Sequence, residues 1–209
     1  MARLRLGILV SGTGTNLGAI LDAVARRDLD AEVRLVISNI EQAPALERAS
    51  KAGVPARAIS HRGYATREEF DRALVTAFRE AKVEWVVLAG FMRLLSTEFL
   101  ATFAGRIINI HPALLPAFPG VNAQRRALEH GVKVSGCTVH FVDEAVDSGP
   151  IIAQRAVPVH DDDDESSLRQ RILVEEHALL VQVLQALAAD RVQVIARANL
   201  RPLVSVRAS

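Results

Sequence analysis

Apolar positions in the first half of the chain alternate between short continuous runs and helical spacing. Continuous runs are typical of strands buried on both faces of a sheet, and they occupy residues 4–10, 32–38, 83–89 and 106–110. Apolar residues at spacings of three and four predict helices over 15–27, over 43–52 and, behind a capping-box sequence at 66–69, from Phe70 onward. This alternation predicts an α/β fold: a doubly wound, mostly parallel sheet with helices on both faces.

The pattern changes after residue 111. Residues 111–120 hold three prolines and should be irregular. The pattern then predicts a short helix, two strands, a long helix and a tail with two strand-like runs, over residues 121–130, 134–142, 151–157, 164–189 and 191–209. We expect one domain over residues 1–209 with an antiparallel C-terminal part. Within it, residues 1–110 form the doubly wound half, 111–190 a second half, and 191–209 a tail to which we assign no role.

Composition narrows the classes of protein that fit. The 209 residues are 50% hydrophobic, and the formal net charge of +1 argues against a dedicated nucleic-acid binder. Cys137 is the one cysteine, so we expect no internal disulfide and no cysteine-held metal. The N-terminal apolar run breaks at Ser11, too early for a signal-peptide core or a membrane span. We therefore expect a soluble, cytoplasmic protein without nucleic-acid or membrane partners; whether it is a monomer or homodimer does not follow from the composition.

The loop after the first strand, residues 11–16, reads Ser-Gly-Thr-Gly-Thr-Asn and precedes a predicted helix. Small residues there let backbone N–H groups approach an anion, and the helix N-terminus adds partial positive charge. Leu17 stands where the dinucleotide fingerprint needs glycine, and no Gly-Lys-Ser/Thr follows. A single phosphate group fits this loop best, and the alternative is a plain strand-to-helix turn.

Asn109 and His111 lie at the end of the predicted strand 106–110. Because strand side chains alternate, both should project from the same face at the carboxyl edge of the sheet. An amide can stabilise an oxyanion and an imidazole can carry a proton near neutral pH, which suits acyl transfer. The alternative is a histidine that caps a strand and an asparagine that closes a turn. Asp147, within Asp-Ser-Gly-Pro, is by itself typical of a turn.

Four other features allow two interpretations. His140 lies in a predicted strand and is more typical of a packed than of a catalytic residue, and Cys137 of a small buried one. The acidic run 161–165 is more typical of a solvated loop that caps a helix than of a metal site. Glu176 falls in the centre of the apolar face of the helix 164–189, which requires either a partner or a cavity.

Together these segments resemble the phosphoribosylglycinamide formyltransferase family, the folate-dependent formyltransferases of purine synthesis. The matching stretches are in family order and extend from residue 6 to about residue 190; they include residues 8–17, 88–96, 108–116, 136–142, 147–150 and 175–177. The His-Pro and Asp stretches identify only the wider superfamily of folate-linked formyltransferases and hydrolases. The loop at 11–16 is the signal specific to this family.

The resemblance implies transfer of a formyl group from 10-formyltetrahydrofolate, as co-substrate, to the amine of glycinamide ribonucleotide, with no metal. Asn109, His111 and Asp147 would form the catalytic trio, with Asp147 raising the pKa of His111. The residues implied for the ribonucleotide are Gly12, Thr13, Gly14, Thr15, Asn16 and Glu176. Those implied for the folate are Arg67, Met92, Arg93, Leu94, Leu95, Asn109, Val142, Asp143, Glu144, Ala145, Val146 and Asp147. The half 1–110 would bind phosphate, and 111–190 would bind folate and carry out catalysis.

Two main alternatives to this function stay open, and formyltransferases that act on initiator tRNA or on sugar nucleotides are further rivals. A formyltetrahydrofolate hydrolase would use the same trio with water as the acceptor, and a non-catalytic module would only bind phosphate or folate. Ala117, Asn122 and Leu173 depart from the residues frequent in the family, so the outer substrate contacts are not assigned.

Overall fold

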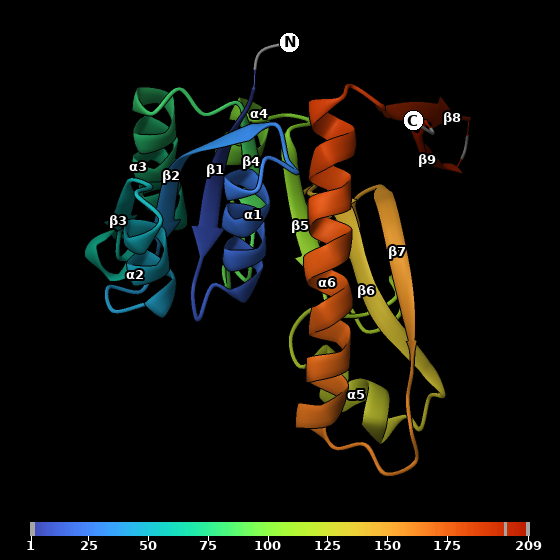
Figure 1. Cartoon of the computed structure of the whole chain (residues 1–209). Helices are drawn as coiled ribbons and strands as arrows, with labels where there is room; N and C mark the ends of the chain where they lie inside the picture. The colour runs from blue at the N-terminus through green and yellow to red at the C-terminus, as the bar shows by residue number, and fades with distance from the viewer. Residues whose placement is uncertain (1–2, 199, 208–209) are drawn as a thin grey trace. The chain divides into compact units, whose positions relative to one another are not determined.

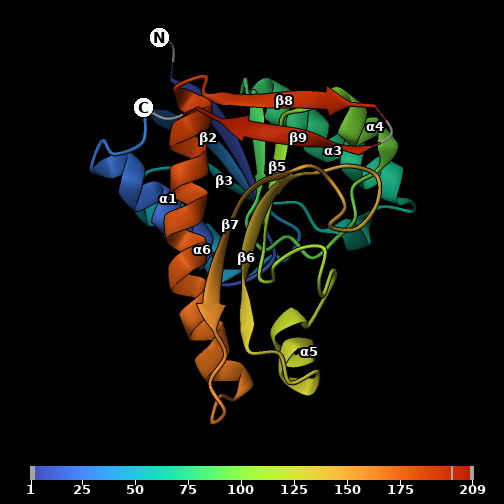
Figure 2. The same cartoon turned by 90° about the vertical axis from the view of Figure 1, so that its right-hand side faces the viewer.

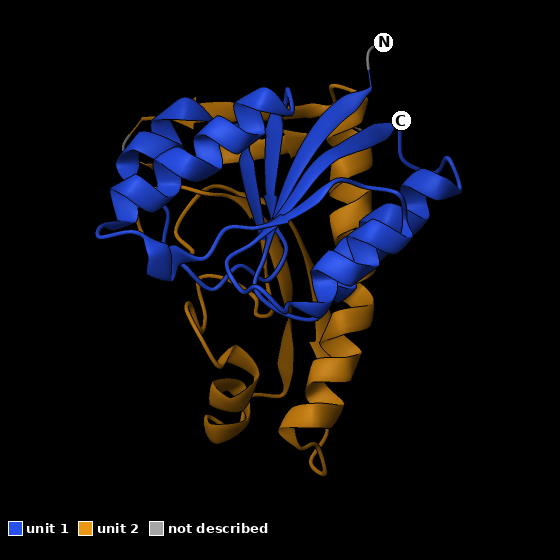
Figure 3. Ribbon diagram, turned by 90° about the vertical axis from the view of Figure 1, so that its left-hand side faces the viewer, with its two compact units in different colours: residues 1–109 blue, residues 110–209 orange. Residues whose placement is uncertain are grey.

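The computed structural model describes residues 3–198 and 200–207 and divides into two compact units. Unit 1 ends at Asn109 and unit 2 begins at Ile110, as the two colours of Figure 3 show. The division falls inside one strand, β5 (Ile107–His111). Residues 199, 208 and 209 of the predicted tail, and residues 1 and 2, lie outside the described residues. The prediction of a single domain stays a prediction.

Unit 1 is built on a parallel sheet, with the strand order β3-β2-β1-β4-β5 (Figure 1). Besides β5, its strands are β1 (Leu4–Val10), β2 (Ala31–Ser38), β3 (Ala56–Ala58) and β4 (Trp85–Leu88). Its helices are α1 (Thr15–Ala25), α2 (Pro44–Lys51), η1 (His61–Gly63), α3 (Arg67–Glu80) and α4 (Thr97–Thr102). Figure 3 shows helices on both sides of this sheet, as the doubly wound prediction requires.

The continuous apolar runs became strands because both of their faces are covered. Leu6, Ile8 and Leu9 of β1 are fully buried, and β4 is buried from Val86 onward. Phe70, Leu74 and Phe78 form the buried face of α3, which the helical spacing predicts. The core of unit 1 therefore lies on the two faces of its sheet, and the carboxyl ends of the strands are left to the loops.

Unit 2 has antiparallel pairing. Strand β6 (Val134–Phe141) pairs with β7 (Ile151–Pro158), and β8 (Val192–Arg197) pairs with β9 (Leu200–Val206). The helices are α5 (Ala123–Glu129) and α6 (Glu165–Ala188). Figures 1 and 2 show α6 along β6 and β7, and the hairpin of β8 and β9 beyond its C-terminal end. The buried face of α6 contains Leu168, Ile172, Leu179 and Val183.

The α/β class, the mostly parallel sheet and the antiparallel C-terminal part are confirmed. Among the described residues, β3, η1 and α4 are the elements that the apolar pattern did not predict. The capping box at 66–69 is half right. The Thr66 hydroxyl accepts from the Glu69 N–H at 3.1 Å, but the Glu69 carboxylate accepts from Ala65, one residue before the position a capping box requires. The acidic run caps α6 as expected, since Asp164 accepts from the Ser167 N–H at 2.8 Å.

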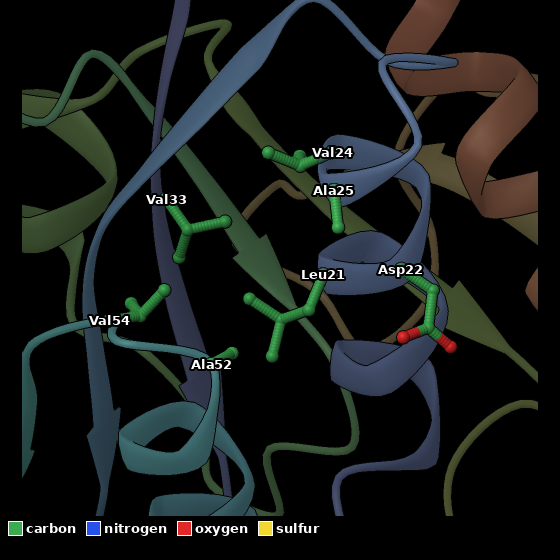
Figure 4. A pocket seen from close by; sticks show the side chains of 7 residues that line it. All are labelled: Leu21, Asp22, Val24, Ala25, Val33, Ala52 and Val54. Atoms are coloured by element: carbon green, nitrogen blue, oxygen red, sulfur yellow. The ribbon is translucent and has the colours of Figure 1, made fainter.

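A hollow of about 250 Å³ lies in unit 1, away from every predicted site residue. Figure 4 shows aliphatic side chains of α1, β2 and the segment after α2 around it, with Asp22 as the single charged group. An apolar lining with a carboxylate does not suit a phosphate, so this hollow is not the predicted anion site. Within the described part of the chain, no helix combines the length and the apolar character needed to cross a membrane.

Candidate active site

His111 and Asp147 meet inside unit 2. The His111 Nδ1 lies 3.2 Å from Asp147 Oδ2, and the two side chains are only 5% and 11% exposed. The other ring nitrogen, Nε2, lies 2.9 Å from the carbonyl oxygen of Phe118. Asp147 Oδ2 also accepts from the Gly120 N–H at 2.7 Å. The loop that follows β5 therefore supplies a partner to each member of the pair.

That loop, residues 112–120, is irregular as predicted and is anchored on β6 and β7. The Thr138 hydroxyl donates to the carbonyl of Ala113 at 2.7 Å and accepts from the Leu115 N–H at 3.1 Å. Gln154 Nε2 donates to the carbonyl of Leu115 at 2.9 Å. These hydrogen bonds, two of them buried, fix the course of the loop and, with it, the Phe118 carbonyl and the Gly120 N–H.

Asp147 lies in the loop between β6 and β7 with a φ of 50°, a left-handed conformation in which aspartate is among the tolerated residues. The same loop closes tightly at Gly149, because a Cβ there would lie 1.9 Å from the carbonyl oxygen of Phe141. The Phe141 N–H donates to the carbonyl of Pro150 at 2.9 Å. Asp147 is thus a turn residue and a partner of His111, and the two interpretations of its sequence are compatible. In the same loop Val142 is half-buried, whereas residues 143–146 are exposed, including Asp143, Glu144, Ala145 and Val146.

His140 contacts the other oxygen of the same carboxylate. Its Nε2 lies 3.5 Å from Asp147 Oδ1, and its Nδ1 lies 2.7 Å from the carbonyl oxygen of Phe141. The register of β6 against β7 shifts between Val139 and His140, and such irregularities re-aim side chains. The sequence interpretation of His140 as a packed residue is right about its burial but missed this contact. No local motif signals it, because the contact depends on the register shift.

Burial and charge oppose each other in this cluster. Burial lowers the pKa of His111 below its usual value, although the Asp147 carboxylate and the Phe118 carbonyl act to raise it. The expectation that Asp147 raises the pKa of His111 is therefore right for that one interaction and wrong for the net direction. Burial acts to raise the pKa of Asp147, but hydrogen bonds from His140 and Gly120 and the nearby imidazoles outweigh it, so this pKa is lowered. Asp147 is thereby held as a carboxylate.

The hydrogen-bond geometry sets where protons can reside. A carbonyl oxygen only accepts, so His111 Nε2 must carry hydrogen. When this ring is neutral, its other nitrogen, Nδ1, faces Asp147 with a lone pair rather than a proton. A single additional proton on His111 therefore gives the carboxylate a further donor. This arrangement can accept one proton from a reacting group and stabilise it against Asp147.

Asn109 is the last residue of unit 1, where it pairs in register with Leu88 of β4. It lies two residues before His111 in β5, so the two side chains share one face of that strand, as predicted. Asn109 is half-buried, whereas His111 is buried. An amide at a strand end has the chemistry for stabilising an oxyanion.

The loop between β1 and α1, where the sequence predicts an anion site, turns through a left-handed glycine. Gly14, with a φ of 69°, precedes the first residue of α1, Thr15, and the side chain of Asn16 is buried. Gly12 and Thr13 are exposed. A Cβ on Gly14 would lie 2.6 Å from the Cβ of Ala45, so glycine is required here for both conformation and space. The loop thus leads into a helix N-terminus, the kind of position at which anions bind, and the phosphate site itself stays a prediction.

The predicted folate segment, residues 92–95, follows β4 in unit 1. Met92 and Leu94 are 70% and 56% exposed, so both apolar side chains are open to contact with a ligand. Leu95 is half-buried. The guanidinium of Arg93 lies 5.9 Å above the centre of the Phe70 ring. Arg67, the first residue of α3, pairs with Glu68 at 3.4 Å and is exposed.

Glu176 is buried in α6, 7% exposed, as the helical wheel predicts. Burial of the Cys137 thiol, and secondly the negative charge of Glu176, raise the pKa of Cys137 to about 12. Cys137 is therefore a buried, inert thiol, as expected. Arg155 pairs with the neighbouring Glu175 at 2.8 Å. Across the described residues, no cluster of three or more histidine, cysteine or acidic side chains is arranged to hold a metal ion.

The mostly parallel sheet places this chain in the α/β class, and the buried imidazole–carboxylate pair gives it groups suited to proton transfer. The chain belongs to the formyl transferase family, whose model matches residues 4–184. This confirms the resemblance found in the sequence.

Individual relatives support the same assignment. The chain is 45% identical over 194 residues to a phosphoribosylglycinamide formyltransferase of Mycobacterium tuberculosis, covering 92% of this chain and 89% of that protein. It is 51% identical over 177 residues to the trifunctional purine biosynthetic protein adenosine-3 of Drosophila melanogaster, covering 84% of this chain but only 13% of that much longer protein. The crystal structure of glycinamide ribonucleotide transformylase 1 from Symbiobacterium toebii matches with a TM-score of 0.93 and 47% identity, covering 98% of this chain and 94% of that one.

Proposed function

We propose that this protein transfers the formyl group of 10-formyltetrahydrofolate to the amine of glycinamide ribonucleotide. The observation that carries the proposal is the buried contact of His111 with Asp147, 3.2 Å between Nδ1 and Oδ2. This pair occurs in a member of the formyl transferase family that is 45% identical to a phosphoribosylglycinamide formyltransferase over 92% of its length. The protein would act in the cytoplasm, as a monomer or homodimer, on these two small molecules alone.

In the proposed reaction the neutral amine attacks the formyl carbon and gives a tetrahedral intermediate with negative charge on oxygen. Asn109 would donate a hydrogen bond to that oxygen, and a donor of this kind typically lowers the barrier by about 3–4 kcal/mol. The attacking nitrogen must lose a proton. The lowered pKa values of Asp147 and His111 favour their unprotonated forms, so each has a lone pair that can accept this proton.

The proton path follows from the contacts of the pair. Asp147 would accept the proton of the amine through a water molecule and pass it to His111 Nδ1, which lies 3.2 Å away. The resulting imidazolium donates to Asp147 and to the Phe118 carbonyl at once, so both ring nitrogens are satisfied. The intermediate then collapses, the C–N bond to the folate breaks, and the proton held by His111 passes back through Asp147 and water to the departing nitrogen, which returns His111 to its neutral form. No covalent enzyme intermediate and no metal is needed.

The substrate contacts follow the family resemblance. The N–H groups of residues 12–16 would hold the ribonucleotide phosphate, and Glu176 would contact the ribose or its neighbourhood. The backbone of residues 92–95 would hold the pterin, Arg67 would line the folate site, and the loop 142–147 would close over the ring. The exposure of Met92 and Leu94 and the left-handed Gly14 support these assignments.

The test is to mix the protein with 10-formyltetrahydrofolate, with and without glycinamide ribonucleotide, and to follow both deformylation of the folate and formylation of the ribonucleotide. We expect turnover only with the ribonucleotide. Formate release that the ribonucleotide does not stimulate would instead identify a hydrolase. Binding of both compounds without turnover would identify a non-catalytic module.

A further inference from the structure

Ser11 joins the two segments of unit 1 that the proposed function assigns to different substrates. Its hydroxyl accepts from the Met92 N–H at 2.9 Å, and its own N–H donates to the carbonyl of Gly90 at 3.0 Å. Gly12, the next residue, begins the phosphate loop, and Met92 begins the folate segment. The carbonyl of Gly12 also accepts from the Ala45 N–H at 3.2 Å, which ties the loop to the start of α2.

The direction of each hydrogen bond around Ser11 is fixed by chemistry. The Ser11 hydroxyl lies 2.6 Å from Asn39 Oδ1, which can only accept, so the hydroxyl proton points at Asn39 and a lone pair faces Met92. Asn39 Nδ2 lies 3.3 Å from His61 Nδ1, which therefore accepts. The amide of Asn39 is thus held on both sides and holds the hydroxyl in turn. The hydroxyl is oriented to receive the Met92 N–H.

The far end of the folate segment is anchored on α3. Asp71 Oδ2 accepts from the Ser96 N–H at 2.5 Å, and Asp71 is only 1% exposed. The Ser96 hydroxyl in turn accepts from the Phe99 N–H at 3.3 Å and caps α4. Residues 92–95 therefore run between two side-chain anchors that come from other elements of the same unit. A segment that binds through its backbone depends on such anchors for its position.

We infer that Ser11 is a positioning residue that sets the Met92 backbone for the folate and couples the folate segment to the ribonucleotide loop, with Asp71 as the second anchor. The inference rests on the proposed function, because that function assigns ligands to the two segments. Binding free energy at one segment then depends on whether the other is occupied, and the coupling is reciprocal.

The test measures binding of tetrahydrofolate, which carries no formyl group, by calorimetry with and without saturating glycinamide ribonucleotide. In the wild type we expect the ribonucleotide to tighten tetrahydrofolate binding. In Ser11→Ala the Kd for tetrahydrofolate alone should rise about 3- to 10-fold, as expected for one lost hydrogen bond. The ratio of the Kd without the ribonucleotide to the Kd with it should fall towards one. Ser11→Thr keeps the hydroxyl and should restore both. Ser135→Ala is the matched control, since Ser135 is buried in β6 and its hydroxyl has no hydrogen-bond partner among the described residues.

A second measurement does not depend on any ligand. Amide hydrogen exchange should become faster at Met92 in Ser11→Ala and faster at Ser96 in Asp71→Ala, while Asp71→Asn, which keeps an acceptor, should stay close to the wild type. Unchanged exchange at Met92 would overturn the anchoring. Faster exchange at Met92 with unchanged tetrahydrofolate affinity would overturn the role of Ser11 in folate positioning. The same holds if Ser135→Ala loses as much tetrahydrofolate affinity as Ser11→Ala, or if the wild type binds no tetrahydrofolate. A wild type that binds both compounds but transfers no formyl group would instead reject the proposed function and leave the coupling measurable.

Discussion

The imidazole of His111 and the carboxylate of Asp147 lie 3.2 Å apart in the interior of unit 2, and each depends on the loop after β5 for its second partner. The Phe118 carbonyl fixes one ring nitrogen of His111 as a donor, which leaves the other to face Asp147. The carboxylate is in turn held by the Gly120 N–H and faces His140. The pair is therefore one site for an incoming proton rather than two independent groups.

Asp147→Asn should remove this proton site and leave the turn in place. Asparagine tolerates the φ of 50° that Asp147 adopts, so the loop should keep its course. Loss of general acid–base chemistry typically lowers turnover by about 10²- to 10⁴-fold, and we expect kcat for formyl transfer to fall within that range. The measurement is the pH dependence of kcat. Asp162→Asn, at an exposed position of the acidic run, is the control. A variant profile with the height and shape of the wild type would refute the role of Asp147.

The candidate site was predictable from sequence to the extent that its members lie next to one another in one strand. Asn109 and His111 share a face of β5, which strand periodicity alone predicts. The contact of Asp147 with His111 depends on where the loop between β6 and β7 meets the end of β5, and only the resemblance to a family pointed to it. The contact of Asp147 with His140 depends on a register shift in β6, which no pattern of residue types encodes. The net pKa direction of His111 was missed because burial cannot be read from its neighbours in sequence.

His111 should make the protein sensitive to acid. Burial lowers the pKa of His111 below 6.5, so the unfolded chain binds a proton there at a higher pH than the folded protein does. The free energy of unfolding therefore falls as the pH drops below about 6.5, by at most about 1.4 kcal/mol per pH unit from this group. His111→Gln should lose this contribution.

Urea denaturation at about pH 7.5 and about pH 5.5 measures the effect as a difference between pH values, which removes the cost of the substitution itself. We expect a smaller loss of stability on acidification in His111→Gln than in the wild type. His160→Gln changes an exposed position, and it should lose as much stability between the two pH values as the wild type does. Equal losses in the wild type and His111→Gln would show that His111 is not held neutral.

Removing His140 should raise the pKa of Asp147. Burial is the largest influence on this carboxyl and acts to raise its pKa, and the hydrogen bond from His140 is the largest influence in the other direction. In His140→Leu the effect of burial is less opposed, so Asp147 should take up its proton at a higher pH than in the wild type. Carbon-13 NMR titration of labelled aspartate carboxyl groups measures this directly. His140→Gln retains a donor and should lie between the two, and an unchanged Asp147 titration in His140→Leu would contradict the contact.

Local pattern predicts the elements of this fold wherever many apolar residues repeat, and it fails where an element is short. The run in β1 and the wheel of α6 each bury side chains along their whole length, so their signals are strong. In contrast, α4 has six residues with only Phe99 buried, and β3 has three residues with none buried. Such elements form because longer neighbours already position them: β3 extends the edge of β2, and the Ser96 hydroxyl caps α4.

Gly14→Ala and Gly53→Ala separate two reasons for glycine in unit 1. Both residues have a left-handed backbone, with φ of 69° and 71°, so alanine costs about 1–2 kcal/mol of stability at either position. A Cβ on Gly14 would also lie 2.6 Å from the Cβ of Ala45, whereas nothing lies within 4 Å of one on Gly53. Overpacking of this kind costs about a further 1–3 kcal/mol. Gly14→Ala should therefore lose more unfolding free energy in urea than Gly53→Ala.

Because relief of the clash must move either the phosphate loop or α2, the KM for glycinamide ribonucleotide should rise in Gly14→Ala alone. Equal stability losses and equal KM values in the two variants would mean that the loop at Gly14 can move without cost. Such a loop would not provide the preformed anion site that the proposed function requires.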